Sequence, residues 1–184
     1  NLNASSASGN IIITETDAVS LDSIITANGF IEVTAGNTIT GINIQSLTDA
    51  SGNNISLTTN GNILIDSIKA GMDYTRIELT SSGNIREVSP DDPGIDISAH
   101  YIYLDAAGGF GSTIQPELEP EIDAVILEFH DTDFILNHDG DIELIINAGG
   151  IVDVEATGTI TIIDLTAPGG SVILDAGIDI LIGN

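Results

Sequence analysis

The sequence predicts an all-β protein built as a parallel β-solenoid (β-helix), a stack of coils of about 20–25 residues each. Short isoleucine-rich stretches alternate apolar and polar residues, and they recur after similar turns at near-regular spacing. Aromatic residues make up only 4% of the chain, and Trp is absent. An antiparallel β-sandwich is the alternative, because Asn-Gly and Asp-Gly turns also suit hairpins, but immunoglobulin-like sandwiches usually carry a core Trp.

The recurring phrase is a Gly-Asn, Gly-Asp or similar turn followed by an alternating strand. Gly, Asn and Asp tolerate the positive φ of tight turns, and a period of two places alternate side chains on opposite faces. Isoleucine and valine dominate these stretches, and β-branched residues suit a pleated, half-buried surface. In chain order, the expected strands are 11–14, 30–34, 55–58, 63–65, 77–80, 95–98, 125–129, 142–146, 152–154, 160–162 and 178–182.

The spacing predicts one continuous stack over residues 1–184, with the first coils at 8–27, 28–50 and 51–75. Asn residues at the turns are expected to form ladders in which each side chain bonds to the next coil. Four of the five prolines lie between residues 90 and 120. Because proline cannot sit within a central ladder, we expect loop excursions near 89–94 and 111–121.

Charge and composition exclude several classes of protein. Three basic residues, Lys69, Arg76 and Arg86, face 28 acidic ones, and the net charge is −25. Binding to nucleic acid or to an anionic membrane needs Lys and Arg, whereas an acidic surface attracts cations.

No stretch approaches ~18 consecutive apolar residues, so no transmembrane span is expected. Without cysteine, disulfides and thiolate chemistry are excluded. Because the chain begins at Asn1, we expect a processed subunit or a segment of a longer protein.

Closely spaced carboxylates are the best candidate ion ligands. The pairs are Asp91 with Asp92, Asp131 with Asp133, and Asp139 with Asp141. Calcium binds several oxygen ligands, yet neither an EF-hand loop nor a tandem Gly-Gly-x-Gly-x-Asp repeat is present. We therefore favour solvated turn residues with local hydrogen bonds, and calcium is the one cofactor considered.

The three histidines offer a second candidate for metal binding. His130 and His138 could face each other across a turn with Asp131 or Asp133, whereas His100 stands apart. None has the spacing of a helical zinc motif. We favour exposed or partly packed histidines on strand faces, and the sequence assigns no metal ligand.

The sequence does not predict an enzyme. Paired carboxylates could serve a glycoside hydrolase or a polysaccharide lyase on a β-helix. Such enzymes usually need aromatic residues on which sugar rings stack, and lyases need basic residues to neutralise the uronate. The chain has only three tyrosines, Tyr74, Tyr101 and Tyr103, and three basic residues. No nucleophile elbow, phosphate loop or dinucleotide fingerprint appears. No catalytic or cofactor-binding residue is therefore assigned.

Several runs in the chain resemble one family. Residues 83–87, 94–99 and 103–111, with the later stretch 137–142, are similar to a unit of the filamentous-haemagglutinin-like giant bacterial surface adhesins. The resemblance implies a right-handed parallel β-helix, secretion to the cell surface and a role in attachment or matrix. Two features depart from the family pattern: Phe110 stands where these repeats often carry Ile, and no N-terminal secretion domain is recognisable.

We expect an extracellular structural or adhesive β-solenoid. The first strand stretch, at 11–14, and the last, at 178–182, leave open β edges, which associate unless capped. Head-to-tail stacking of identical subunits would give an open filament, and neighbouring repeats of the same chain would make equivalent contacts. The alternative function is a carbohydrate-binding adhesin module that grips a glycan through loops 89–94 and 111–121.

Overall fold

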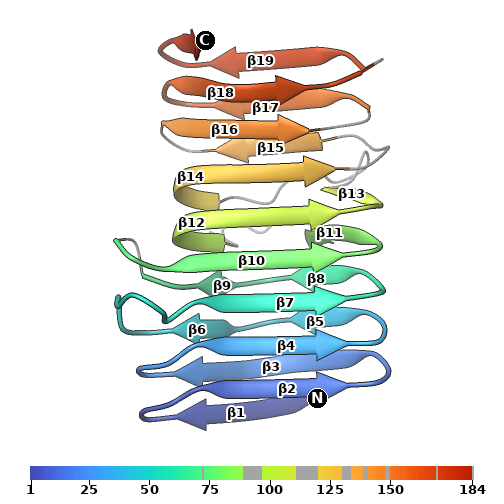
Figure 1. Cartoon of the computed structure of the whole chain (residues 1–184), viewed down its shortest axis with the longest axis vertical. Helices are drawn as coiled ribbons and strands as arrows, with labels where there is room; N and C mark the ends of the chain where they lie inside the picture. Colours follow the sequence, from blue (N-terminus) through green and yellow to red (C-terminus); the bar gives the residue numbers. More distant parts are fainter. Residues whose placement is uncertain are drawn as a thin grey trace.

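The computed structural model describes residues 1–71, 73–88, 97–110, 120–129, 134–138, 141–147, 150–168 and 170–183. Within these ranges the chain forms a parallel β-solenoid of about seven turns and contains no helix. Figure 1 shows the strands stacked along the long axis of the molecule, with the two termini at opposite ends of the stack. The predicted fold class is confirmed, and the antiparallel sandwich is wrong because the recorded strand pairs are parallel.

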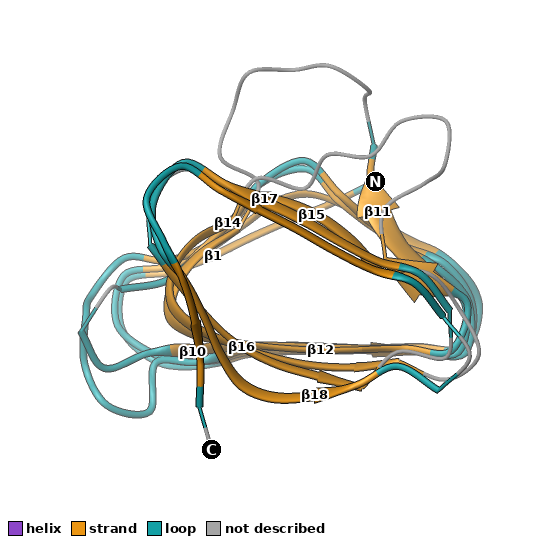
Figure 2. Ribbon diagram, turned by 90° about the horizontal axis from the view of Figure 1, so that it is seen from above, coloured by secondary structure: helices purple, strands orange, loops and turns teal. Residues whose placement is uncertain are grey.

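The strands form two long walls that meet at the corners of each coil (Figure 2). The first wall consists of β2 (Ile11–Glu15), β4 (Ile31–Ala35), β7 (Ile55–Thr59), β10 (Arg76–Ser81), β16 (Ile142–Asn147), β18 (Ile160–Thr166) and β20 (Ile180–Ile182), with the later residues of β12 (Ile97–Ala106) and β14 (Pro120–Phe129). The first residues of β12 and β14 continue the ladder of β9 on the other side of the corner. The second wall consists of β1 (Leu2–Ser6), β3 (Val19–Thr26), β5 (Ile39–Gly41), β6 (Ile44–Ser46), β8 (Ile63–Ile65), β9 (Ile68–Lys69), β11 (Asn84–Glu87), β13 (Gly109–Phe110), β15 (Phe134–His138), β17 (Val152–Ala156) and β19 (Val172–Ala176).

Register along the first wall confirms the predicted coil length. Ile11 lies opposite Ile31, Ile31 opposite Ile55, Ile55 opposite Ile77 and Ile77 opposite Ile102, offsets of 20, 24, 22 and 25 residues. The offset shortens to 18 residues between Leu144 and Ile162. Equivalent residues of successive coils therefore stand directly above one another.

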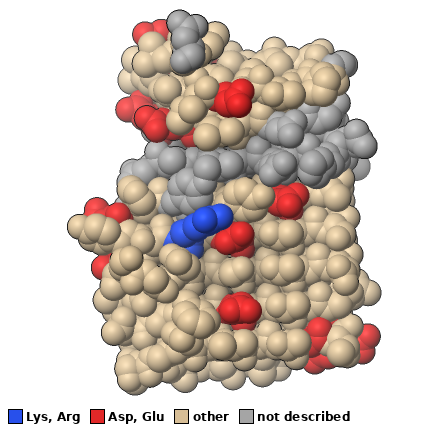
Figure 3. Space-filling model, in the orientation of Figure 1, with Lys and Arg blue, Asp and Glu red and all other residues tan. Residues whose placement is uncertain are grey.

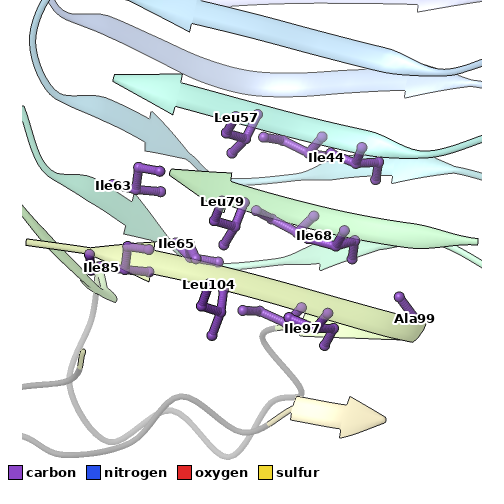
Figure 4. Packing of buried hydrophobic residues seen from close by; sticks show 14 of the residues in the cluster. Ile44, Leu57, Ile63, Ile65, Ile68, Leu79, Ile85, Ile97, Ala99 and Leu104 are labelled. Atoms are coloured by element: carbon purple, nitrogen blue, oxygen red, sulfur yellow. The ribbon is translucent and has the colours of Figure 1, made fainter. Parts of the chain in front are cut away.

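Along each strand, every second side chain points into the interior of the solenoid. In β4, Ile31, Val33 and Ala35 are buried, whereas Glu32 and Thr34 are exposed, as the sequence predicts. Inward side chains of successive coils stack in columns, such as Leu57, Leu79 and Leu104 (Figure 4). Each fully buried Leu or Ile contributes about 1.5–3 kcal/mol of hydrophobic stabilisation, so the stacked columns hold the coils together.

Side chains at the corners join each coil to the next. The Asn10 Oδ1 accepts a hydrogen bond from the backbone N–H of Phe30 at 3.1 Å, and the Asn54 Oδ1 accepts one from Arg76 at 2.8 Å. A buried hydroxyl also joins two coils: the Ser46 hydroxyl donates a hydrogen bond to the Gly29 carbonyl of the preceding coil at 3.0 Å. The predicted Asn ladder is confirmed for Asn10, Asn54 and Asn62, which accept from a backbone N–H of the next coil, whereas Asn37 accepts from Thr38 within its own turn.

The predicted loop near 111–121 is too long at its C-terminal end. Pro120 and Glu121 belong to β14, where they lie opposite Ile97 and Ser98 of β12. Proline is compatible with the first residue of a strand because it need not donate to the ladder there. The other predicted loop, 89–94, and residues 111–119 lie outside the described residues.

Candidate interaction surface

Two enlarged corners project from the stack between the second wall and the first. One joins β6 to β7 (residues 47–54), and the other joins β9 to β10 (residues 70–75, of which Met72 is not described). The equivalent corner one coil earlier, between β3 and β4, contains only residues 27–30. Figure 1 shows both enlarged corners at the left edge, one above the other. We call them the corner loops.

A single carboxylate ties the corner loops together. The Asp49 Oδ2 accepts a hydrogen bond from the backbone N–H of Asp73 at 2.8 Å, and its Oδ1 accepts one from Tyr74 at 3.1 Å. Hydrogen bonds to an ionised acceptor are stronger than neutral ones. The Thr75 hydroxyl donates to the Gly71 carbonyl and closes the upper loop on itself. The upper loop is therefore held on the lower one by specific contacts.

The lower loop is anchored in the same way to the coil beneath it. The Asn53 Nδ2 donates to the Asn28 Oδ1 at 2.9 Å and to the Thr48 carbonyl at 3.0 Å, and the Thr48 hydroxyl donates to the Ala27 carbonyl. Three successive corners are thus linked. The linkage leaves Tyr74, which is 67% exposed, presented to solvent on an ordered loop.

Beside the upper corner loop, β10 and β12 present a charged and aromatic cluster. The Arg76 Nη2 lies 3.5 Å from the Glu78 Oε2, and both side chains are 41% exposed. The Arg76 guanidinium carbon lies 5.4 Å from the centre of the Tyr103 ring, on the neighbouring strand. Contacts of these kinds each contribute up to about 1 kcal/mol at exposed sites. They orient Arg76 across the outer face of the wall.

Charge is unevenly distributed along the stack. All three basic residues lie in two successive coils: Lys69 ends one coil on β9, and Arg76 on β10 and Arg86 on β11 belong to the next. Together with four carboxylates (Asp66, Asp73, Glu78 and Glu87), they give residues 66–88 a net charge of 3 − 4 = −1. Residues 1–65 carry five acidic residues, and residues 89–184 carry nineteen, with no basic residue in either range. Figure 3 shows a blue patch near the middle of the first wall.

The structure places some of the predicted ion ligands. The Asp141 Oδ1 accepts a hydrogen bond from the backbone N–H of Thr159 at 2.7 Å, so this carboxylate has a backbone partner in the next coil. His100 is exposed on β12, and His138 belongs to β15. The remaining candidates lie outside the described residues: Asp91, Asp92, His130, Asp131, Asp133 and Asp139.

The described part of the chain brings no metal centre together. Within it, no group of three His, Asp or Glu side chains is close enough to hold a metal ion. No helix in the same ranges is long and apolar enough to cross a membrane. Comparison of the chain with protein-family models, with curated proteins and with solved structures finds no match.

Sequence reasoning missed both the corner loops and the cluster beside them. The available signal is the corner length, which rises from four residues at 27–30 to eight at 47–54. A second signal is positional, since every basic residue and every tyrosine falls between residues 69 and 103. Both signals coincide on the same two coils.

Proposed function

We propose that this protein is an extracellular structural and adhesive rod whose coils stack head to tail on further coils of the same kind. The observation that carries the proposal is the exposed last coil. Ile160 and Ile162 of β18 are 0% and 3% exposed, whereas their register partners Ile180 and Ile182 of β20 are 39% and 74% exposed. The last coil therefore presents core side chains and an open β edge to whatever covers it.

A second copy of the chain fits this end. The column that ends at Ile182 begins at Ile11, so the first coil of a second copy offers the same kind of side chain at the same position. Leu2, the register partner of the buried Leu21, is 36% exposed in the first coil, and Ile11 is 9% exposed. Such a contact is heterologous and leads to an open fibre. Further coils of the same chain would make an equivalent contact.

The proposed role is mechanical, and stability is additive along the stack. The parallel solenoid, the aliphatic core and the acidic surface are all compatible with the resemblance to filamentous-haemagglutinin-like adhesins, which carries the proposal of a cell-surface location. The nineteen acidic residues of the C-terminal half would keep rods apart, and divalent cations would reduce that repulsion.

Two matched variants test the stacking. Ile180→Asp places a charge on the open end of the last coil, whereas Leu181→Asp places the same charge on the outward side of the same strand. Negative-stain electron microscopy, with and without millimolar calcium, is expected to show fibres for the unchanged chain and for Leu181→Asp, and only short rods for Ile180→Asp. A chain that stays a short rod at every calcium concentration would contradict the proposal.

A further inference from the structure

We propose that two rods also pair side by side, antiparallel, through the outer face of β10 and β12, with Arg76 of each copy against Glu78 of the other. The pairing builds on the proposed rod function, because it gives filaments a lateral contact in addition to the end-to-end one. Its occupant is a second copy of this chain. Three observations carry it: an even outer face, an asymmetric charge distribution, and an exposed pair of opposite charges.

The outer face of the first wall is regular enough to receive a second rod. Thr14, Thr34, Thr58 and Thr80 follow one another in register over four strands. The neighbouring outward column contains Glu32, Ser56 and Glu78 in the same register. The threonine column is a regular line of short side chains in the lower part of the face shown in Figure 3, and on β12 the two columns continue with Tyr103 and Asp105.

The charge distribution selects the antiparallel orientation. A parallel pair would bring together two segments 89–184, each with nineteen carboxylates distributed over both walls, whereas an antiparallel pair brings each such segment beside residues 1–65, which carry five. Repulsion between like charges acts over about a Debye length, ~10 Å at 0.1 M salt. The facing walls of two rods in contact lie within this distance. An antiparallel pair also crosses at the middle coil, where the net charge is −1.

The Arg76 and Glu78 pair is self-complementary at such a crossing. In a two-fold contact, residue i of one copy meets residue j of the other and the reverse, so both Arg76 side chains meet a Glu78 at once. Both side chains are 41% exposed. Arg and Tyr are the residues most typical of interface hot spots, and Arg76 and Tyr103 already lie together here.

Charge reversal tests the contact with the ends blocked. All proteins carry Ile180→Asp, so that end-to-end stacking cannot contribute to the measured mass. Arg76→Glu and Glu78→Arg are made separately, and Lys69→Glu is the control because it makes the same charge change on β9. Sedimentation equilibrium reports the mass against the monomer value of 19.0 kDa, and circular dichroism confirms that every variant is folded.

The end-blocked parent and the Lys69→Glu control are expected to form dimers at ~0.1 M salt, which screens the repulsion between two strongly acidic chains. Arg76→Glu and Glu78→Arg alone should each dimerise about tenfold more weakly or worse, because each faces like charge across the two-fold axis. An equimolar mixture of the two should restore dimers, since opposite charges then meet at both contacts. An end-blocked parent that stays monomeric, reversed variants that dimerise like the parent, or a mixture that shows no rescue would each overturn the pairing. None of these results bears on end-to-end stacking, which the Ile180→Asp and Leu181→Asp pair tests separately.

Discussion

The same corner of the solenoid is built in two different ways in successive coils. At 27–30, the chain turns in four residues, and backbone bonds join it to the coil below: Gly9 donates to the Asn28 carbonyl at 2.7 Å and Ala27 to the Ser6 carbonyl at 2.8 Å. In the corner loops, backbone bonds to the adjoining coils remain at the ends, where Leu47 donates to the Thr26 carbonyl at 3.0 Å, and the Asp49 carboxylate accepts from the loop above. A tight corner is therefore joined to the next coil by backbone bonds, whereas the middle of an enlarged corner is held by a side chain.

The comparison implies that the tight corner tolerates no added atom. A Cβ on Gly29 would lie 2.3 Å from the Gly9 carbonyl oxygen and 2.5 Å from its carbon. These are backbone atoms of the adjoining coil, so the coils themselves would have to separate. Gly29→Ala is therefore expected to lower the free energy of unfolding by about 3 kcal/mol, the upper part of the range for overpacking, in equilibrium urea denaturation.

Gly36→Ala tests the same steric clash at another turn, because a Cβ on Gly36 would lie 2.0 Å from the Thr16 carbonyl oxygen of the preceding coil. Both variants should be destabilised to a similar degree. If Gly29→Ala unfolds at the same urea concentration as the parent, the coils are not in fixed contact at this corner.

The enlarged corner should respond to the same substitution less strongly and for a different reason. Gly52, in the lower corner loop, has φ +94° and no heavy atom within 4 Å of an added Cβ. Ala has room there but disfavours the left-handed backbone by about 1–2 kcal/mol. We expect Gly52→Ala to cost about that much by urea denaturation, less than Gly29→Ala. Gly52→Asn is the control, since Asn tolerates positive φ better, and a loss as large for Asn as for Ala would contradict this explanation.

Alternation and turn chemistry were sufficient to predict the strands of the first wall and the stacking of coils, whereas of the second wall only β8 and β17 are among the expected strands. Ile31 and Val33 point inward, and Asn10 bonds to the next coil, as the pattern indicates. The corner loops could not be placed in the same way, because Asp49 and Tyr74 are 25 residues apart and meet only when the coil offset is known. The prediction for Pro120 was wrong for a local reason, since a proline that opens a strand has the same sequence signal as one in a loop.

The smallest expected effect concerns Asp49 itself, because the amides it binds lie at the surface and water replaces the lost acceptor. Asp49→Ala is expected to reduce global stability by about 1 kcal/mol or less, yet to open the upper corner loop locally. Hydrogen exchange of the Asp73 and Tyr74 amides should therefore accelerate strongly, while exchange at Ile77, buried in β10, should follow only the global change. Asp17→Ala removes the same charge from an exposed turn of an earlier coil and should leave both amides unchanged. Equal exchange rates of the Asp73 and Tyr74 amides in the two variants would mean that the upper corner loop is held by its own residues. The Asp49 carboxylate would then not replace the backbone bonds seen at 27–30.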